Sequence, residues 1–135
     1  MSGETDLGAL LRGMTADLIP GTFVFVTLSE EGIPPGLTPR MMFHEAEGTT
    51  LILPREQAEA AGLAHEFPCR MITLNIHSAL EAVGFMAVIA TALAREGMGV
   101  NPVAGFYHDH LFVPEDRVDD AMRVLVRMAA GAEVA

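Results

Sequence analysis

Two six-residue stretches decide the fold: LILPRE at residues 51–56 and LFVPED at residues 111–116. In each stretch, three apolar residues typical of a strand are followed by a proline and then by two charged residues. The fixed backbone angle of proline suits the first turn of a helix, so each stretch predicts a strand that leads directly into a helix. The two copies indicate an internal repeat of strand, strand and helix.

The residues around the first copy extend this pattern. A short helix is expected at residues 5–14, with Thr5 or Asp6 as its cap. Residues 22–29 are rich in β-branched and aromatic side chains and predict a strand. Residues 30–40 contain three prolines and predict an irregular loop. Residues 41–47 and 49–53 then form a hairpin that turns at Gly48, and the helix that begins at Pro54 ends at Gly62.

The second half predicts a similar order with a longer helix. Apolar and polar residues alternate in the strand expected at residues 67–76. A helix follows from Ala79 to Glu96, with Ser78 as its cap and Glu81 as the partner in a capping box. Residues 100–107 and 110–113 form the second hairpin, which reverses at His108 and Asp109. The last helix begins at Pro114.

This order of elements predicts an α+β protein of the ferredoxin-like type, in which helices pack on antiparallel sheets. We place the two halves at residues 1–69 and 70–135. Each half is short of one strand, and an unpaired sheet edge is unfavourable. We therefore expect strands from the two halves to complete each other, so that the halves interlock.

Composition excludes several classes of function. The chain of 135 residues carries a formal net charge of −10, which disfavours nucleic acid and anionic membranes as partners. Cys69, the single cysteine, is expected to be a small buried residue in a reducing compartment. The polar, acidic N-terminus lacks the pattern of a signal peptide, and the longest apolar stretch is too short to span a bilayer. We expect a cytoplasmic protein without a cofactor.

Several segments resemble a known family. IHSALEAVG at residues 76–84, GFYHDHLFVP at residues 105–114, LILP at residues 51–54 and the strand at residues 23–28 are similar to a bacterial group of tandem ACT-domain proteins. The similarity covers nearly the whole chain and is most specific in the second half. The group is related to the regulatory domains of aspartate kinases and to arginine-sensing ACT proteins. The resemblance implies two βαββαβ-like ACT units that bind small molecules, often amino acids, between units.

The resemblance also implies where a ligand would bind, namely the loop after the first strand of the second half. The start of the helix expected at Ala79 would offer free backbone N–H groups to a carboxylate. Gly84 would allow close approach of a ligand, and Glu81 could meet an α-amino group. The opposite wall would come from residues 101–105. The candidate ligand residues are Asn75, His77, Ser78, Glu81, Val83, Gly84, Asn101, Ala104 and Gly105.

Each of these residues also has a purely structural interpretation. Ser78 would cap a helix in any protein, and Gly84 would permit close packing of a helix on a sheet. Asn101 precedes a proline, and such a pair is common in turns without a ligand. The sequence leaves both interpretations open.

The segment Tyr107, His108, Asp109 and His110 is the most distinctive local cluster. Two histidines beside an aspartate could bind a transition metal, which would permit a small metal-dependent hydrolase. A closed metal site needs more ligands, and the other histidines lack a recognisable spacing. No nucleophile motif, phosphate-binding loop or dinucleotide fingerprint occurs. We therefore expect an ordinary hairpin here, with no metal and no catalytic residue.

The sequence thus predicts a regulatory protein rather than an enzyme. We expect it to sense an amino acid or a similar small metabolite at an interface between ACT units. The alternative is an interaction module that forms a homodimer without a ligand. A homo-oligomer, a dimer first, is expected in either case. The sequence does not name the ligand.

Overall fold

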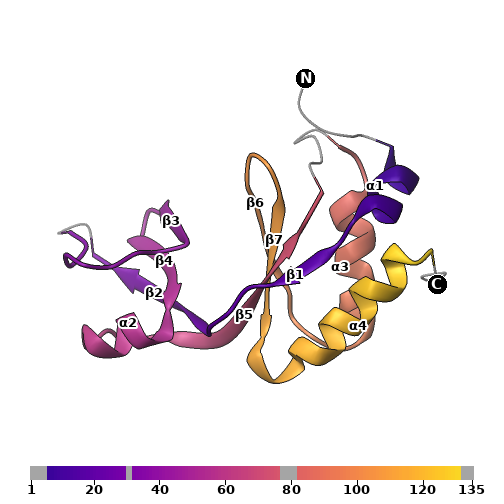
Figure 1. The fold of residues 1–135 in the computed structure, drawn as a ribbon. Coiled ribbons are helices and arrows are strands. Elements are labelled where there is room, and N and C mark those ends of the chain that lie inside the picture. The colour runs from indigo at the N-terminus through magenta and orange to yellow at the C-terminus, as the bar shows by residue number, and fades with distance from the viewer. Residues whose placement is uncertain (1–5, 30–31, 77–81, 132–135) are drawn as a thin grey trace. The chain divides into compact units, whose positions relative to one another are not determined.

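The computed structural model describes residues 6–29, 32–76 and 82–131. It divides into two compact units. We call residues 21–69 the small unit, and residues 1–20 with 70–135 the large unit. Figure 1 shows strands and helices in both, which confirms the predicted α+β class. The first twenty residues belong to the same unit as the second half of the chain.

The described residues of the small unit form β2 (Phe23–Leu28), β3 (Met41–His44), β4 (Thr49–Pro54) and α2 (Arg55–Ala60). The first residues of β5 also belong to this unit. Strand β4 lies between β3 and β2 and is antiparallel to both, and β2 pairs with the first residues of β5 (Glu66–Leu74). The core consists of side chains from alternate positions of β2 and β4 and from α2: Val24, Val26, Leu51, Leu53 and Ala58.

The large unit places its helices on one side of its strands (Figure 1). Its elements are α1 (Leu7–Gly13), β1 (Ala16–Leu18), the rest of β5, α3 (Phe85–Arg95), β6 (Asn101–Ala104), β7 (Asp109–Pro114), the 3₁₀ turn η1 (Glu115–Arg117) and α4 (Val118–Ala129). The strand order is β1-β5-β7-β6. Buried residues of α1, α3 and α4 pack against alternate residues of β5 and β7, and these strand residues are Ile72, Leu74, Leu111 and Val113.

The two hairpins confirm the internal repeat. In the first, Met41 pairs with Ile52 and His44 with Thr49. In the second, each partner carries a number 60 higher, so that 101 pairs with 112 and 104 with 109. Pro54 and Pro114 then precede their helices with nearly the same backbone angles, φ −56° and −54°. The strand-proline-helix pattern therefore repeats together with the hairpin that precedes the proline.

The two halves differ in the segment that connects the first strand to the hairpin. In the large unit α3 lies between β5 and β6. In the small unit the described residues between β2 and β3 form no helix, as the prolines predict. Ile33 and Leu37 of that loop pack against the core of the small unit instead.

The structure differs from the sequence predictions in four places. The first strand of the first hairpin does not extend to residue 47: β3 ends at His44, and the turn is residues 45–48. The helix predicted from Ala79 to Glu96 is wrong at residues 82–84, which are not helical, and α3 begins at Phe85, directly after Gly84 with φ +92°. Residues 79–81 lie outside the described residues. The second hairpin does not reverse at His108 and Asp109; the turn is residues 105–108, and Asp109 opens β7. Strand β1 was not predicted, because three residues held by long-range pairing with β5 carry too little local signal.

Candidate functional site: the loop after β5 and the β6–β7 turn

The loop that follows β5 is anchored to the segment that follows α1. The backbone N–H of Asn75 donates to the carbonyl of Thr15 at 2.7 Å, and the N–H of Ile76 donates to the carbonyl of Leu74 at 2.9 Å. Gly13 leaves room for this loop, because a Cβ there would lie 2.8 Å from the Cδ1 atom of Ile76. The side chain of Asn75 is exposed. The loop therefore leaves the sheet in a defined direction with a polar side chain available.

The same loop ends at the N-terminus of α3. Gly84 occupies the N-cap position in a left-handed conformation, which glycine adopts at low cost. Its carbonyl accepts a hydrogen bond from the N–H of Val88 at 3.0 Å. The N–H groups of the first helical turn lack acceptors within the helix, which gives this end a partial positive charge. Val83, directly before the cap, is 86% exposed.

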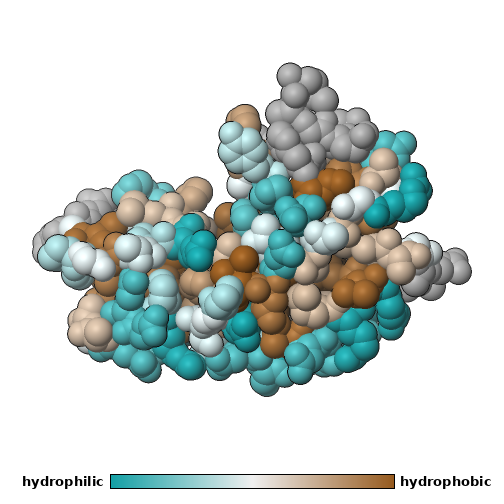
Figure 2. Space-filling view, in the orientation of Figure 1, coloured by the Kyte–Doolittle hydropathy of each residue, from teal (hydrophilic) through white to brown (hydrophobic). Residues whose placement is uncertain are grey.

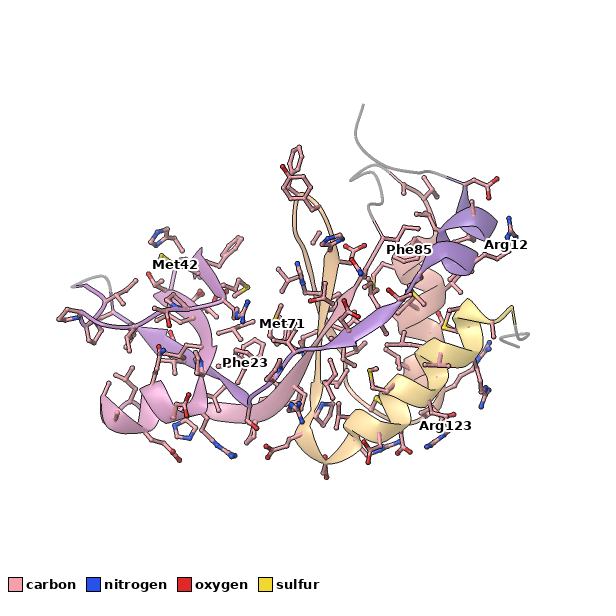
Figure 3. All side chains as sticks on the ribbon, viewed as in Figure 1. Arg12, Phe23, Met42, Met71, Phe85 and Arg123 are labelled. Atoms are coloured by element: carbon pink, nitrogen blue, oxygen red, sulfur yellow. The ribbon has the colours of Figure 1, made fainter. Side chains whose placement is uncertain are left out.

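The side chain of Phe85, the first residue of α3, is buried in the core of the large unit. Figure 3 shows Phe85 among the helices, whereas Arg12 and Arg123 lie on the outer surface. Burial of this aromatic ring fixes the start of α3 relative to the sheet, because a buried aromatic residue contributes a large apolar area. Three further candidate residues, His77, Ser78 and Glu81, lie outside the described residues.

The β6–β7 turn lies next to this loop. The ring Nδ1 of His108 is 3.4 Å from the carbonyl oxygen of Ile76, and a carbonyl can only accept, so Nδ1 is the donor. Within the turn, the N–H of Gly105 donates to the carbonyl of His108 at 2.8 Å. Two predicted parts of the site, the loop after β5 and Gly105, are thus brought together through His108.

A second histidine joins the hairpin to β5. The Nδ1 atom of His110 and the hydroxyl of Thr73 are 3.0 Å apart. Since Ile72 and Leu111 point to the helices, Thr73 and His110 lie on the opposite face of the sheet. A Cβ on Gly105 would lie 3.0 Å from the carbonyl oxygen of His108 and 3.1 Å from the Nε2 atom of His110, so a larger residue there would require these groups to shift. The rings of His108 and His110 are 6.5 Å apart.

The tip of this turn consists of two exposed aromatic residues. Phe106 is 62% exposed and Tyr107 is 64% exposed. Their ring centroids are 5.1 Å apart and their planes meet at 71°, an edge-to-face arrangement. The sequence singled out Tyr107 but gave no reason to select Phe106. The tip of the first hairpin, which corresponds to this one in the repeat, carries no aromatic residue, so the aromatic pair is specific to the second hairpin.

Two of the predicted wall residues lie at opposite ends of one strand. Ala104 pairs with Asp109 directly beside the turn. Asn101 pairs with Phe112 at the other end of β6, three residues away, or roughly 10 Å along a strand. Strand β7 also separates β6 from β5. The structure therefore brings Asn75, Ala104 and Gly105 to one end of the sheet and places Asn101 at the other.

Neither Thr73 nor the contact between His108 and Ile76 was foreseen. The alternation of apolar and polar residues in β5 could have assigned Thr73 to the face away from the helices. The His108 contact joins residues 32 positions apart and follows only from the tertiary fold.

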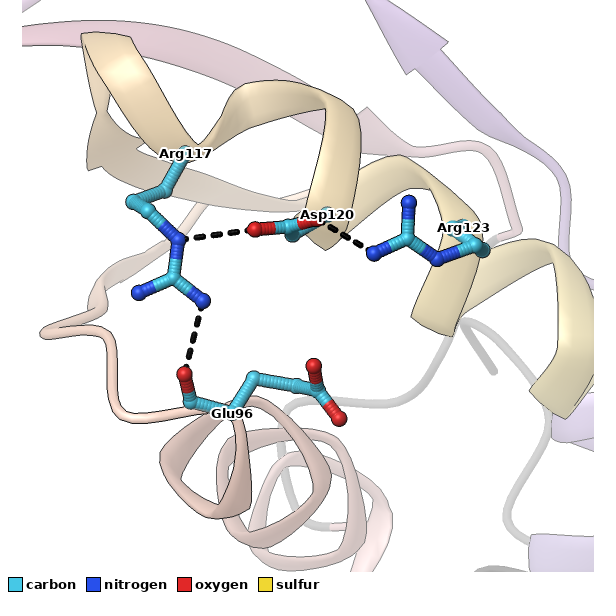
Figure 4. A network of polar contacts seen from close by, with 4 residues as sticks. All are labelled: Glu96, Arg117, Asp120 and Arg123. Carbon is cyan, nitrogen blue, oxygen red and sulfur yellow. Dashed lines mark hydrogen bonds and ion pairs between the residues drawn. The ribbon is translucent and has the colours of Figure 1, made fainter.

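The far end of α3 is held by a network on α4 (Figure 4). Arg117 donates to the carbonyl of Glu96 at 2.7 Å and to the carboxylate of Asp120 at 2.8 Å. Arg123 also donates to Asp120. The hydrogen bonds from Arg123 and then from Arg117 lower the pKa of Asp120, while the carboxylate raises the pKa of Arg123. Hydrophilic residues cover this part of the large unit along its lower edge in Figure 2.

Within the described part of the chain, no three His, Cys, Asp or Glu side chains are grouped so as to hold a metal ion. Among the same residues, no helix is both long enough and apolar enough to cross a bilayer. Cys69 is fully buried and its thiol donates to the carbonyl of Phe23 at 3.3 Å, which confirms the interpretation as a small buried residue.

Comparison with family models gives two consecutive matches. One ACT-domain model matches residues 2–70, and a second ACT-domain model matches residues 66–127. The chain therefore belongs to the ACT-domain family, with two ACT domains in tandem. This confirms the resemblance found in the sequence and the ferredoxin-like architecture of its units.

Among solved structures, the chain is similar to VC0802 from Vibrio cholerae, described as a protein of unknown function and possible transport protein. The two share 40% identity at a TM-score of 0.82, over 91% of this chain and 95% of that one. Protein Atu0741 from Agobacterium tumefaciens is 16% identical at a TM-score of 0.74, over 86% of this chain and 89% of that one. The regulatory subunit of aspartate kinase from Thermus flavus shares the fold, with 11% identity, a TM-score of 0.58, and coverage of 86% and 96%. A comparison with curated proteins found no match.

Proposed function

We propose that this protein is a regulatory ligand-binding protein that senses an amino acid or a similar small metabolite. Membership of the ACT-domain family supports a regulatory rather than a catalytic role. We further propose that the ligand binds in the large unit, at the end of the sheet where the loop after β5 meets the β6–β7 turn. The observation that carries this location is the hydrogen bond of His108 to the carbonyl of Ile76.

The chemistry of this end of the sheet suits an amino acid. The first turn of α3 offers backbone N–H groups and a partial positive charge to a carboxylate. The loop contributes the exposed side chain of Asn75, and the glycines at 84 and 105 leave their positions without side chains. His77, Ser78, Glu81, Val83 and Ala104 complete the proposed set. We propose that binding changes the association of the chain with a partner or with a second copy.

A thermal-shift screen against individual amino acids and nucleotides tests this proposal. A ligand that binds only the folded chain stabilises it by about 2.7 kcal/mol at one hundred times its Kd. For a chain of this size that corresponds to a rise in melting temperature of roughly 5–10 °C. Isothermal titration should then give a saturable heat for the same compound. Absence of both effects with every compound would count against ligand sensing.

Substitutions of Asn75 and Asn101 provide a matched pair of variants. Asn75 lies in the proposed site, whereas Asn101 lies at the other end of β6. We expect Asn75→Ala to weaken binding roughly tenfold and Asn101→Ala to leave it unchanged. Equal effects of the two substitutions would place the ligand elsewhere.

A homodimer is a second candidate function, and the edge strand β3 favours it. Met42 is 45% exposed and Phe43 is 61% exposed. Neighbouring residues of a strand point to opposite faces, so β3 presents apolar side chains on both faces of a sheet edge. Two copies could pair this strand about a two-fold axis. Light scattering should then give twice the chain mass of 14.4 kDa, and Phe43→Lys should give the monomer. A monomeric wild-type chain would exclude this candidate.

A further inference from the structure

The outer strands of the two hairpins differ at one position, although their registers agree. Strand β3 is the outer strand of the small unit, and β6 is an outer strand of the large unit. Met42 pairs with Leu51 in the first hairpin, and Pro102 pairs with Leu111 at the corresponding position of the second. Proline has no backbone N–H and interrupts strand pairing wherever that N–H is needed. The direction of the N–H at this position therefore decides what the difference means.

In β3, the backbone groups at this position point away from β4. Opposite residues of an antiparallel pair alternate between exchanging both backbone hydrogen bonds and exchanging none. Glu45 and Gly48 exchange both, with N–H to carbonyl distances of 2.8 and 3.3 Å. Counted back along the register, His44 and Met42 belong to pairs that exchange none. Their N–H and C=O groups therefore face the free edge of β3, where a further strand would pair.

The same count gives the opposite result for β6. The N–H of Gly105 donates to the carbonyl of His108 at 2.8 Å, so Pro102, three residues earlier, belongs to a pair that exchanges no hydrogen bonds. Its ring nitrogen faces the free edge, where it leaves the pairing with β7 intact and offers no donor to a further strand. The outer strand β1 is only three residues long, and short edges resist pairing. Among the described strands, β3 is therefore the edge best suited to accept another strand.

The charges around β3 suit a second copy of the same strand. Arg40 lies directly before β3, whereas Glu45 and Glu47 follow it, and all three residues are exposed. Two copies of a strand related by a two-fold axis run antiparallel, so the start of each lies beside the end of the other. Arg40 of each copy then lies near the acidic residues of the other, and opposite charges attract. The edge is therefore complementary to itself in charge.

We propose that two copies pair β3 with β3 about a two-fold axis beside Phe43, and that Pro102 closes β6 so that assembly ends at the dimer. In this register Met42 exchanges backbone hydrogen bonds with His44 of the partner subunit. Phe43 lies opposite Phe43 of the partner subunit in a pair without hydrogen bonds, the arrangement in which cross-strand side chains are closest. The inference rests on the homodimer proposed above and is independent of ligand sensing.

Exchange of the two residues tests the inference with matched variants. Met42→Pro gives β3 the residue of β6, and Pro102→Met does the reverse. Neither substitution removes a hydrogen bond of its hairpin, because the N–H concerned faces the free edge. Light scattering over a series of concentrations should give twice the chain mass of 14.4 kDa for the wild type and one chain mass for Met42→Pro. Pro102→Met should exceed the dimer mass as the concentration rises, because both edges then accept a strand.

Cysteine cross-linking tests the register separately. In the proposed dimer the two Cβ atoms at position 43 lie about 4.5 Å apart, so Phe43→Cys should form a disulfide between subunits when oxidised glutathione is added. Ala46→Cys is the control, since this exposed position would lie roughly 20 Å from its counterpart. The native Cys69 is fully buried, so the wild type should not cross-link.

The outcomes separate the inference from the functions proposed above. A monomeric wild type would overturn the inference together with the homodimer and leave ligand sensing standing. A dimer that persists in Met42→Pro, or that cross-links as fast through Ala46→Cys as through Phe43→Cys, would overturn the inference and leave a homodimer through another surface. Pro102→Met that stays dimeric at every concentration would overturn the role of Pro102. Where Met42→Pro does not fold, the cross-linking pair decides the register.

Discussion

At the residue scale, different glycines of this chain are required for different reasons, either a positive φ or a close contact with a neighbouring residue. Gly84 ends the loop after β5 with φ +92°, and Gly105 lets the second turn pack on His110. Gly48 combines a φ of +155° with the closest backbone contact among the glycines described. At Gly84 the backbone angle favours glycine, at Gly105 the space does, and only at Gly48 do both apply.

Substitution of Gly48 by alanine should destabilise the chain. The added Cβ would lie 2.7 Å from the carbonyl oxygen of Leu28 and 3.2 Å from the hydroxyl of Thr27. We expect a loss of roughly 1–3 kcal/mol in the free energy of unfolding, measured in urea. Gly99→Ala is the control, because a Cβ there has no neighbour within 4 Å. It should change stability by about 0.5 kcal/mol at most. Equal stability of the two variants would refute the steric argument.

The carboxylate of Asp120 should make stability depend on pH in a defined direction. Hydrogen bonds from Arg123 and Arg117 lower its pKa in the folded chain below the ordinary value of 3.8. A group with a lowered folded pKa contributes stability above its unfolded pKa and loses it as the pH falls through the folded pKa. The difference in melting temperature between wild type and Asp120→Asn should therefore be present at neutral pH and vanish well below pH 3.8.

Asp119 provides the control for this measurement. It is exposed on the same helix and makes no ion pair among the described residues. Asp119→Asn should shift the melting temperature less than Asp120→Asn does at neutral pH. A difference between wild type and Asp120→Asn that stays constant with pH would contradict the assignment.

At the scale of elements, α4 holds the large unit together. Its buried residues pack in the core with α1, α3, β5 and β7, and Arg117 at its start binds the carbonyl at the end of α3. The other side of the helix carries charged residues, as Arg123 in Figure 3 illustrates. Stability should therefore depend strongly on which side of α4 a substitution touches.

Adjacent positions of α4 test this dependence. Leu125 is fully buried, whereas Val126 is 59% exposed. Leu125→Ala should lower the free energy of unfolding by about 2–5 kcal/mol, since it removes buried methyl groups and leaves a cavity. Val126→Ala should cost about 0.5 kcal/mol or less in the same urea titration. Similar losses for the two variants would show that α4 does not pack as described.

The sequence predicts elements well where a strong local signal agrees with the tertiary fold. The strand-proline-helix repeat predicts both hairpins and the start of α2 and η1. It fails at α3, because helix-forming residues before Gly84 suggested that residues 82–84 are helical. Of the site, the sequence indicates the loop and Gly105. The Thr73–His110 and His108–Ile76 contacts require the arrangement of strands and could not be read from spacing.

At the scale of the whole molecule, the tandem arrangement is unequal. The small unit lacks a helix between β2 and β3 among its described residues, while the large unit has α3 between β5 and β6 and takes β1 from the start of the chain. The two units thus share the hairpin and differ in the segment that precedes it. We expect this inequality to separate the roles of the units, with ligand sensing in the large unit.

A crystal structure grown with a mixture of amino acids tests this central claim most directly. Our account predicts density for one ligand per chain, between the loop after β5, the start of α3 and the β6–β7 turn. Its carboxylate should face the backbone N–H groups of α3. Density for an amino acid elsewhere in the chain, or a space at this end of the sheet filled by the chain's own side chains, would contradict it.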